Sequence, residues 1–328
     1  MFNNLINIHD FERLYDQLAE VGFPAMIKKL AGGKRRRVEH AWQHTETVPR
    51  NWWDVPEVLE RWNRLIAGNR NVDSYAYVSR KYLKGGRSRA GISYGCGAGA
   101  REIEWARTRK FKSIDAFDLS RQRILEARER AGIQGLTNIL NFQTADVFDI
   151  VVKDDTYDVA IAEGILHHLT PLKEMLSRVR RMLKNGGLFV VNEYVGPSRF
   201  QWTDCQLALV NGILASMPDG LKTRWGNGRL KKEVHRPGRL SMILNDPSEA
   251  VESPFILQYL REMFDIEEEK AYGGTILHLL LKDIAHHFTS DDRTANRFLR
   301  FAFELEDLVL KNGVMTSDFI FVVCRNRK

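Results

Sequence analysis

A glycine-rich run followed by an acidic residue is the part of the sequence whose residue types and spacing suit chemistry. The run is Ala-Gly-Ile-Ser-Tyr-Gly-Cys-Gly-Ala-Gly at positions 90–99, and Asp118 follows nineteen residues after Gly99. Glycines let backbone N–H groups come close to a ligand, and an acid that ends the next strand can accept hydrogen bonds from ribose hydroxyls. Together they predict a nucleoside-binding site.

The glycine pattern alone fits two kinds of cofactor site. Gly95, Gly97 and Ala100 also satisfy the G-x-G-x-x-G/A pattern of dinucleotide-binding folds. The residues downstream of Asp118 decide between the two, because Asp146 ends a third predicted strand and residues 157–169 predict a fourth strand that runs into a short helix.

These ordered motifs resemble those of class I S-adenosylmethionine (SAM) dependent methyltransferases. The matching segments are residues 92–99, 118–120, 145–146, 166–169 and 183–189. The resemblance implies SAM as cofactor and S-adenosylhomocysteine (SAH) as product, with Asp118 on the ribose and Asp146 on the adenine amino group. A turn or helix-cap role for Asp146 is the alternative. The cofactor-binding residues that the resemblance implies are Ser93, Gly95, Gly97, Gly99, Asp118, Leu119, Asp146, Val147 and Glu163. The family usually has an acid where this chain has Ser93.

Three side chains are candidates for the catalytic base, namely His167, His168 and Glu193. A hydroxyl acceptor is a poor nucleophile until its proton leaves, and a positioned base is worth roughly 10²–10⁴-fold in rate. Adjacent residues on a helix point about 100° apart, so we expect at most one histidine to face the site, and we favour His168. Capping the short helix is the structural alternative for either histidine. Glu193 is also suited to binding an acceptor amine or pairing with Arg199.

Four residues that follow the fifth predicted strand in the chain are candidate contacts of the acceptor, namely Tyr194, Arg199, Phe200 and Trp202. The aromatic rings offer π faces to a sulfonium or a sugar ring, and packing within a lid is the alternative. Acids and histidines show no spacing typical of a metal site. We therefore predict no metal.

The elements that must position these residues alternate between strand and helix. Strands are predicted at 90–94, 113–118, 139–144, 157–162 and 188–193, and Ser120 is suited to capping a helix over 121–131. Such alternation predicts a parallel sheet with helices on both faces. Downstream, strands are predicted at 264–270 and 318–324 and helices at 275–287 and 294–310. The resemblance implies that these two strands complete the sheet, the last one antiparallel.

The expected fold class is therefore α/β: a Rossmann-like, seven-stranded, mostly parallel sheet with a helical amino-terminal cap and lid insertions. Four segments are predicted. They are a cap over 1–84, a SAM-binding core over 85–196, a lid or substrate insertion over 197–260, and a carboxyl-terminal completion of the sheet over 261–328. The lid is expected because a long polar and aromatic stretch exceeds an ordinary connector.

Bulk properties limit the other possibilities. The chain has 328 residues and a formal charge of +7, which favours an anionic or sugar-containing acceptor without requiring nucleic acid. Its three cysteines lie far apart, so neither a disulfide framework nor a zinc site is predicted. We expect no membrane span and a cytoplasmic protein, because no apolar run or secretory signal is evident. The helical additions at both ends are suited to building a homodimer.

The function that we expect is SAM-dependent methyl transfer to a hydroxyl of a small molecule, such as a sugar, a glycan precursor or a secondary metabolite. Residues 193–204 resemble those of bacterial methyltransferases associated with polysaccharide or secondary-metabolite pathways. Methylation of RNA or protein is an alternative, as is a non-catalytic partner subunit, which Ser93 motivates. A nicotinamide oxidoreductase fits less well, because the Tyr77 and Lys81 pair precedes the glycine loop instead of following it.

Overall fold

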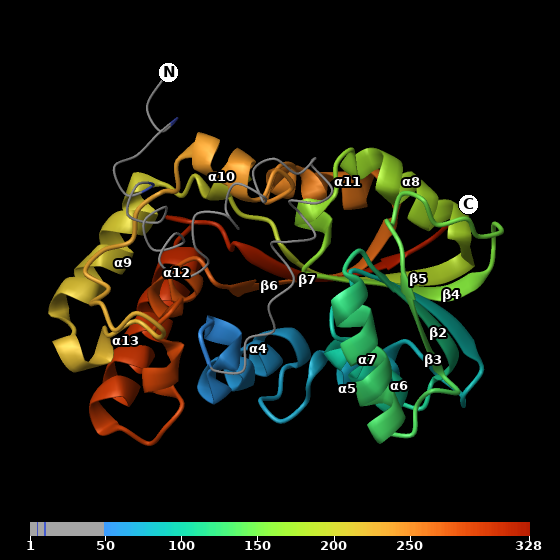
Figure 1. Cartoon of the computed structure of the whole chain (residues 1–328), viewed down its shortest axis with the longest axis horizontal. Helices are drawn as coiled ribbons and strands as arrows, with labels where there is room; N and C mark the ends of the chain where they lie inside the picture. Colours follow the sequence, from blue (N-terminus) through green and yellow to red (C-terminus); the bar gives the residue numbers. More distant parts are fainter. Residues whose placement is uncertain (1–4, 6–9, 11–48) are drawn as a thin grey trace.

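The protein folds around a seven-stranded sheet with the order β3-β2-β1-β4-β5-β7-β6 (Figure 1). The computed structural model describes residues 49–328 together with Leu5 and Asp10. The strands are β1 (Arg89–Tyr94), β2 (Phe111–Asp118), β3 (Leu140–Thr144), β4 (Tyr157–Glu163), β5 (Leu183–Tyr194), β6 (Asp265–Gly273) and β7 (Phe319–Arg325). Strands β1 to β5 pair in parallel, whereas β7 is antiparallel to both β5 and β6. The predicted fold class is confirmed.

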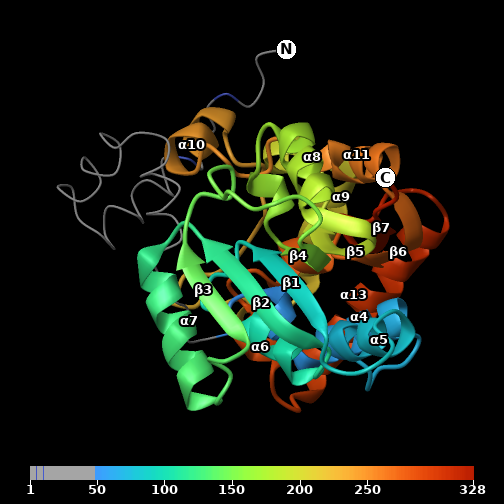
Figure 2. The ribbon, with the colours of Figure 1, turned by 90° about the vertical axis from the view of Figure 1, so that its right-hand side faces the viewer.

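Helices cover both faces of the sheet, with α8 and α11 on one side and α4, α5 and α6 on the other (Figure 2). The helices are α4 (Pro56–Ala67), α5 (Ser74–Lys81), α6 (Ala100–Arg107), α7 (Arg121–Ile133), α8 (Leu172–Met182), α9 (Asp204–Ser216), α10 (Arg239–Asn245), α11 (Ile256–Met263), α12 (Leu277–Leu281) and α13 (Arg293–Lys311). Successive residues of a strand pack into separate hydrophobic cores. Val190 packs on the α6 side of the sheet and Val191 on the α8 side. This period of two is what a sheet buried on both faces requires.

Short-range signals explain where several elements begin. Ser120 accepts a hydrogen bond from the Arg123 N–H and starts α7, which confirms the predicted cap. Helix α7 then continues to Ile133, two residues beyond the predicted end. Thr203 and Asp292 cap α9 and α13 in the same way. The Ser120 cap begins α7 directly after the carboxyl end of β2.

The predicted helix over 275–287 is wrong as a single element. It is broken into α12 and a 3₁₀ turn (Ala285–Phe288), with Asp283 in the left-handed region at φ 66°. The Asp283 N–H donates to the carbonyl of Arg50 at 2.6 Å, and its carboxylate pairs with the Arg50 guanidinium at 3.0 Å. A contact with a segment far away in the sequence therefore breaks a helix that periodicity alone would continue.

The part of the predicted amino-terminal cap that the structure describes is helical, in α4 and α5. The rest of that prediction, up to residue 48, lies outside the described residues apart from Leu5 and Asp10. Trp52, just before α4, is fully buried, and its ring centroid lies 4.5 Å from that of Trp62. None of the helices between residues 49 and 328 has the length and apolar character that a bilayer span requires.

Gly99 provides a test of the packing between the loop after β1 and the sheet. It has φ 78°, and an added Cβ would lie 2.7 Å from Phe142 Cζ and 2.9 Å from Ala127 Cβ. We expect Gly99→Ala to lower the free energy of unfolding by about 1–3 kcal/mol, because both backbone and neighbours must shift. Urea denaturation measures this change.

Gly132→Ala is the matched control. Gly132 lies within α7, and nothing stands within 4 Å of its would-be Cβ. Alanine there should leave the stability unchanged or raise it by up to about 1 kcal/mol. Equal losses in the two variants would contradict the packing that we describe for Gly99.

Candidate functional site

A cavity of about 570 Å³ lies at the carboxyl ends of β1, β2, β3 and β4. Its volume is within the range of roughly 300–1,000 Å³ that is typical of small-molecule sites. The predicted cofactor residues that line it are Gly95, Gly97, Asp118, Leu119, Asp146 and Val147. The fold thus brings residues from three successive strand ends to one cavity, as expected for an open parallel sheet.

Asp118 organises the glycine loop at this cavity. Its Oδ2 accepts a hydrogen bond from the Gly97 N–H at 2.8 Å, and its Oδ1 accepts one from the Ser120 N–H at 2.8 Å. Each carboxylate oxygen keeps a further lone pair for a ligand hydroxyl. Gly95 is required for a steric reason, because it has φ 65° and an added Cβ would lie 2.6 Å from Ile165.

The surroundings of Asp146 agree with both roles considered for it, a turn residue and a cofactor contact. Its Oδ1 accepts a hydrogen bond from the Phe148 N–H at 3.0 Å, which is the turn role. The residue also lines the cavity, which is where a cofactor contact requires it. The turn therefore presents the carboxylate to the cavity.

The other three predicted cofactor residues do not line the cavity. Gly99 is held by packing against Phe142. Ser93 is buried and donates to Glu102, and Glu163 is buried and accepts from Trp105 Nε1 at 2.8 Å. Their cofactor roles are left as predictions.

Glu102 is a buried acid that sequence analysis did not identify. Ser93 Oγ donates to Glu102 Oε1 at 2.7 Å, so α6 places a carboxyl beside the strand position where the resembling family usually has one. Burial raises the pKa of Glu102 to about 7, although the Ser93 hydrogen bond opposes this. The available sequence signal was an acid in the first turn of the helix after the glycine loop.

Glu193 and His167 form a pair beside the turn that carries His168 into the cavity wall, and of the three candidate bases only His168 lines the cavity. Glu193 pairs with His167 Nδ1, and its Oε2 accepts the N–H groups of Ile165 at 2.8 Å and Leu166 at 2.6 Å. Burial works to raise the pKa of Glu193, but His167 and these donors hold it below its usual value. For His167, burial disfavours the charged form of the ring, whereas the neighbouring Glu193 carboxylate favours it. The net effect is that the pKa of His167 is raised.

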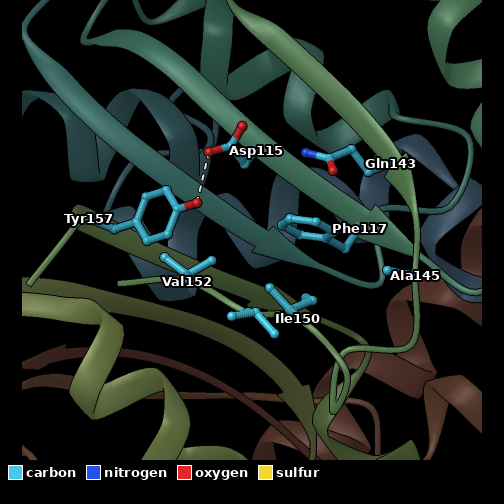
Figure 3. Close-up of a pocket in the computed structure, with 8 residues that line it drawn as sticks. Asp115, Phe117, Gln143, Ala145, Ile150, Val152 and Tyr157 are labelled. Atoms are coloured by element: carbon cyan, nitrogen blue, oxygen red, sulfur yellow. Dashed lines mark hydrogen bonds between the residues drawn. The ribbon is translucent and has the colours of Figure 1, made fainter. Parts of the chain in front are cut away.

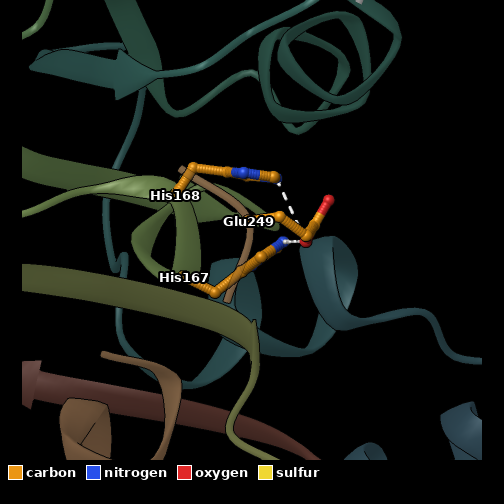
Figure 4. Close-up of side chains that lie close together, drawn as sticks. All are labelled: His167, His168 and Glu249. Carbon is orange, nitrogen blue, oxygen red and sulfur yellow. Dashed lines mark ion pairs between the residues drawn. The ribbon is translucent and has the colours of Figure 1, made fainter. Parts of the chain in front are cut away.

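The two histidines both face the same carboxylate, Glu249 (Figure 4). Of the two, only His168 lines the cavity, and the expectation that at most one faces the acceptor stays a prediction. Their ring centroids lie 4.1 Å apart, with His167 Nε2 at 3.5 Å and His168 Nε2 at 3.9 Å from Glu249 Oε1. Both rings reach Glu249 for a local reason. They end a single 3₁₀ turn, and the backbone becomes extended at Leu169, so the spacing of a regular helix does not apply.

The four candidate acceptor residues lie beside this cluster and do not line the cavity. Tyr194 and Trp202 are buried, and Phe200 stacks on Trp202 with centroids 5.4 Å apart. Arg199 donates to the backbone carbonyls of Asp246, Pro247 and Glu249. Arg199 therefore holds the segment 246–249. The suggested pairing of Glu193 with Arg199 is not observed, because Glu193 pairs with His167.

Several functional candidates were missed by sequence analysis. Arg101 and Arg123 line the cavity, and the Arg101 guanidinium donates to the carbonyl of Glu163. Ser248 also lines the cavity, and Glu249 faces the histidines. The segment around them reads as an ordinary polar turn, so no signal in the sequence marks it.

A second, smaller cavity lies along β2 and β3 (Figure 3). It measures about 260 Å³ and is lined in part by Phe117, Gln143 and Ile150. The Tyr157 hydroxyl donates to Asp115 at 2.8 Å across its end. Its volume falls below the range of small-molecule sites, and we assign it no role.

Comparison with known proteins adds a family match. Residues 92–191 match the family model described as a methyltransferase domain. An erythromycin 3''-O-methyltransferase of Saccharopolyspora erythraea is 22% identical over 204 residues, covering 61% of this chain and 65% of that protein. A ubiquinone/menaquinone biosynthesis C-methyltransferase of Geotalea daltonii is 30% identical over 138 residues, covering 41% and 57%.

A solved structure shares the fold. The geranyl diphosphate C-methyltransferase of Streptomyces coelicolor, in complex with Mg²⁺, geranyl diphosphate and SAH, has a TM-score of 0.50 at 11% identity, covering 90% of this chain and 98% of that one. The chain spans between about a third and two thirds of the length of curated relatives that it matches.

Glu102 should make stability depend on pH. Because its pKa is raised from 4.5 to about 7, the folded protein holds a proton that the unfolded chain loses, and stability falls as pH rises from 4.5 through 7. Glu102→Gln should remove this loss. The variant should gain up to about 3 kcal/mol over the unmodified protein between pH 4.5 and 8.

Urea denaturation across that pH range measures the difference. Glu104→Gln is the control, because Glu104 lies on the same helix but is part of an exposed pair with Arg107. A difference between Glu102→Gln and the unmodified protein that stays constant with pH would contradict the burial argument.

Proposed function

Residues 92–191 form a class I, SAM-dependent methyltransferase domain, and on that premise we propose that the chain transfers a methyl group from SAM to a hydroxyl of a small molecule. The observation that carries the proposal is the pair of His167 Nδ1 and Glu193, which adjoins His168 in the wall of the cavity. The proposed acceptor is a sugar, a glycan precursor or a secondary metabolite.

The residues of the cavity fit the cofactor. Gly95 and Gly97 present bare backbone to it, and Asp118 retains acceptor capacity for ribose hydroxyls. Asp146 would accept from an exocyclic amine, and the Arg101 guanidinium suits a carboxylate. When bound, SAM supplies an electrophilic methyl group on a sulfonium sulfur.

His167 is the proposed base. Glu193 accepts its Nδ1–H, a tautomer assigned from this pairing, and Nε2 then carries the lone pair that takes the proton of the acceptor hydroxyl. Glu193 is fixed by three backbone N–H groups, since Tyr194 N–H also donates at 2.8 Å. Its charge stabilises the imidazolium that forms. Because of this arrangement we now prefer His167 over His168 as the base. The Nδ1 of His168 faces the Ser248 hydroxyl at 3.3 Å instead of a carboxylate.

A hydroxyl acceptor is favoured over carbon by the presence of this base. A histidine oriented by a carboxylate is suited to removing a hydroxyl proton. One relative is named for oxygen methylation and another for carbon methylation, so the relatives leave the choice to the site. The charge of +7 suits an acceptor that carries a phosphate or nucleotide.

The test is methyl transfer from labelled SAM to a panel of sugar nucleotides, free glycans and RNA. We expect label on a hydroxyl of a small molecule, and His167→Gln should lower kcat by roughly 10²–10⁴-fold because the base is lost. Affinity for SAH, measured by calorimetry, should change little. His287→Gln is the control, since that histidine lies in a second adjacent pair that bonds the Thr223 carbonyl.

Three results would contradict the proposal. Label that appears only on RNA would reject the acceptor class. Full activity in His167→Gln would reject the base. Binding of SAH without transfer to any acceptor would instead favour a non-catalytic partner subunit.

A further inference from the structure

His167, His168 and Glu249 converge at the rim of the cavity (Figure 4). Their ligand atoms all lie within 4.8 Å of one another, and across residues 49–328 plus Leu5 and Asp10 no other group of three such side chains does so. Tetrahedral Zn²⁺ with bonds of about 2.0–2.2 Å places neighbouring ligand atoms about 3.3–3.5 Å apart. The observed separations of 3.5 and 3.9 Å from Glu249 Oε1 need only small adjustments.

Each imidazole is held through its other nitrogen. Glu193 accepts the Nδ1–H of His167. Ser248 Oγ donates to Asp246 at 2.6 Å and therefore accepts from Nδ1 of His168, 3.3 Å away. In both rings this assignment puts the lone pair on Nε2, the atom that faces Glu249. A carboxylate on the far nitrogen also orients a metal-binding histidine and raises its basicity.

Charge and burial favour a cation at this point. Glu193, Glu249 and Asp246 all act on the two rings, whereas the guanidinium of Arg199 acts on Asp246 and Glu249 and that of Arg101 acts on Glu193. With both histidines neutral, these three carboxylates outnumber the two guanidinium groups. Side-chain exposures of 12% for His167, 6% for His168 and 18% for Glu249 leave the point shielded from solvent but reachable. A divalent ion would offset the excess negative charge.

We propose that His167, His168 and Glu249 bind a divalent ion of the Zn²⁺ class, and that this ion inhibits methyl transfer. Two imidazoles and one carboxylate are a donor set that Zn²⁺ uses in proteins. The ion takes the lone pair on His167 Nε2, so His167 can no longer accept a proton. The inhibition rests on the proposed function, whereas the binding does not. The sequence does not indicate this site, because Glu249 lies far downstream and only the fold brings it to the histidines.

Binding is tested without any activity measurement. Metal-free full-length protein is titrated with ZnCl₂ by calorimetry and with Co²⁺ by visible absorbance. We expect one equivalent bound with a tetrahedral Co²⁺ spectrum, and affinity at least about tenfold weaker in Glu249→Gln and in His168→Asn. Thermal melting without metal shows whether each variant folds.

The second adjacent pair gives a matched control. His286 and His287 have ring centroids 3.9 Å apart at an angle of 41°, close to the geometry of the first pair, but belong to no described group of three ligands. The double variant His286→Asn/His287→Asn should bind Zn²⁺ as the unmodified protein does. Absence of binding to the unmodified protein, or an equal loss in this control, overturns the site.

Inhibition is tested by methyl transfer with and without Zn²⁺, each protein being compared with its own metal-free rate. The unmodified protein should lose activity and regain it with EDTA, while Glu249→Gln should lose much less at the same Zn²⁺ concentration. Zn²⁺ that binds but leaves the rate unchanged, or raises it, overturns the inhibition. If no acceptor is methylated even without metal, the proposed function fails, and calorimetry still decides the binding site.

Discussion

The buried carboxylate of Glu193 is the constraint on which the acceptor side of the site depends. A charge removed from water must be paired or hydrogen-bonded, and this one takes the N–H groups of Ile165, Leu166 and Tyr194 and the ring of His167. The end of β5 is thereby tied to the turn after β4. Because that turn also carries His168 into the cavity wall, one satisfied carboxylate fixes both histidines relative to the cavity.

Asp118 plays the equivalent part on the cofactor side. It ties the loop after β1 to the start of α7 through the N–H groups of Gly97 and Ser120. The sheet order places β2, β1, β4 and β5 side by side, so the two carboxylates stand along the same edge. Each organises a loop through backbone donors. Asp118 keeps oxygen lone pairs at the cavity, and His167, held by Glu193, keeps an imidazole nitrogen beside the turn that enters the cavity wall.

Local signals in the sequence explain which parts could be predicted. Strand alternation, the Ser120 cap and the acids at strand ends depend on residues close together in the chain, and the structure has them where expected. The approach of Glu249 to the histidines, the carboxyl of Glu102 beside Ser93 and the break at Asp283 depend on contacts between distant segments. No periodicity records such contacts. The shared orientation of the two histidines toward Glu249 could not be predicted either, because it depends on where a single turn ends.

The central claim is that the cavity beside Asp118 and the pair of His167 and Glu193 form one site. A crystal structure of the protein grown with SAH tests this most directly. The account predicts SAH in the cavity, with its ribose hydroxyls within hydrogen-bond distance of Asp118 and its sulfur directed toward the histidines. SAH bound elsewhere, or bound with its sulfur directed away from His167, would contradict the account.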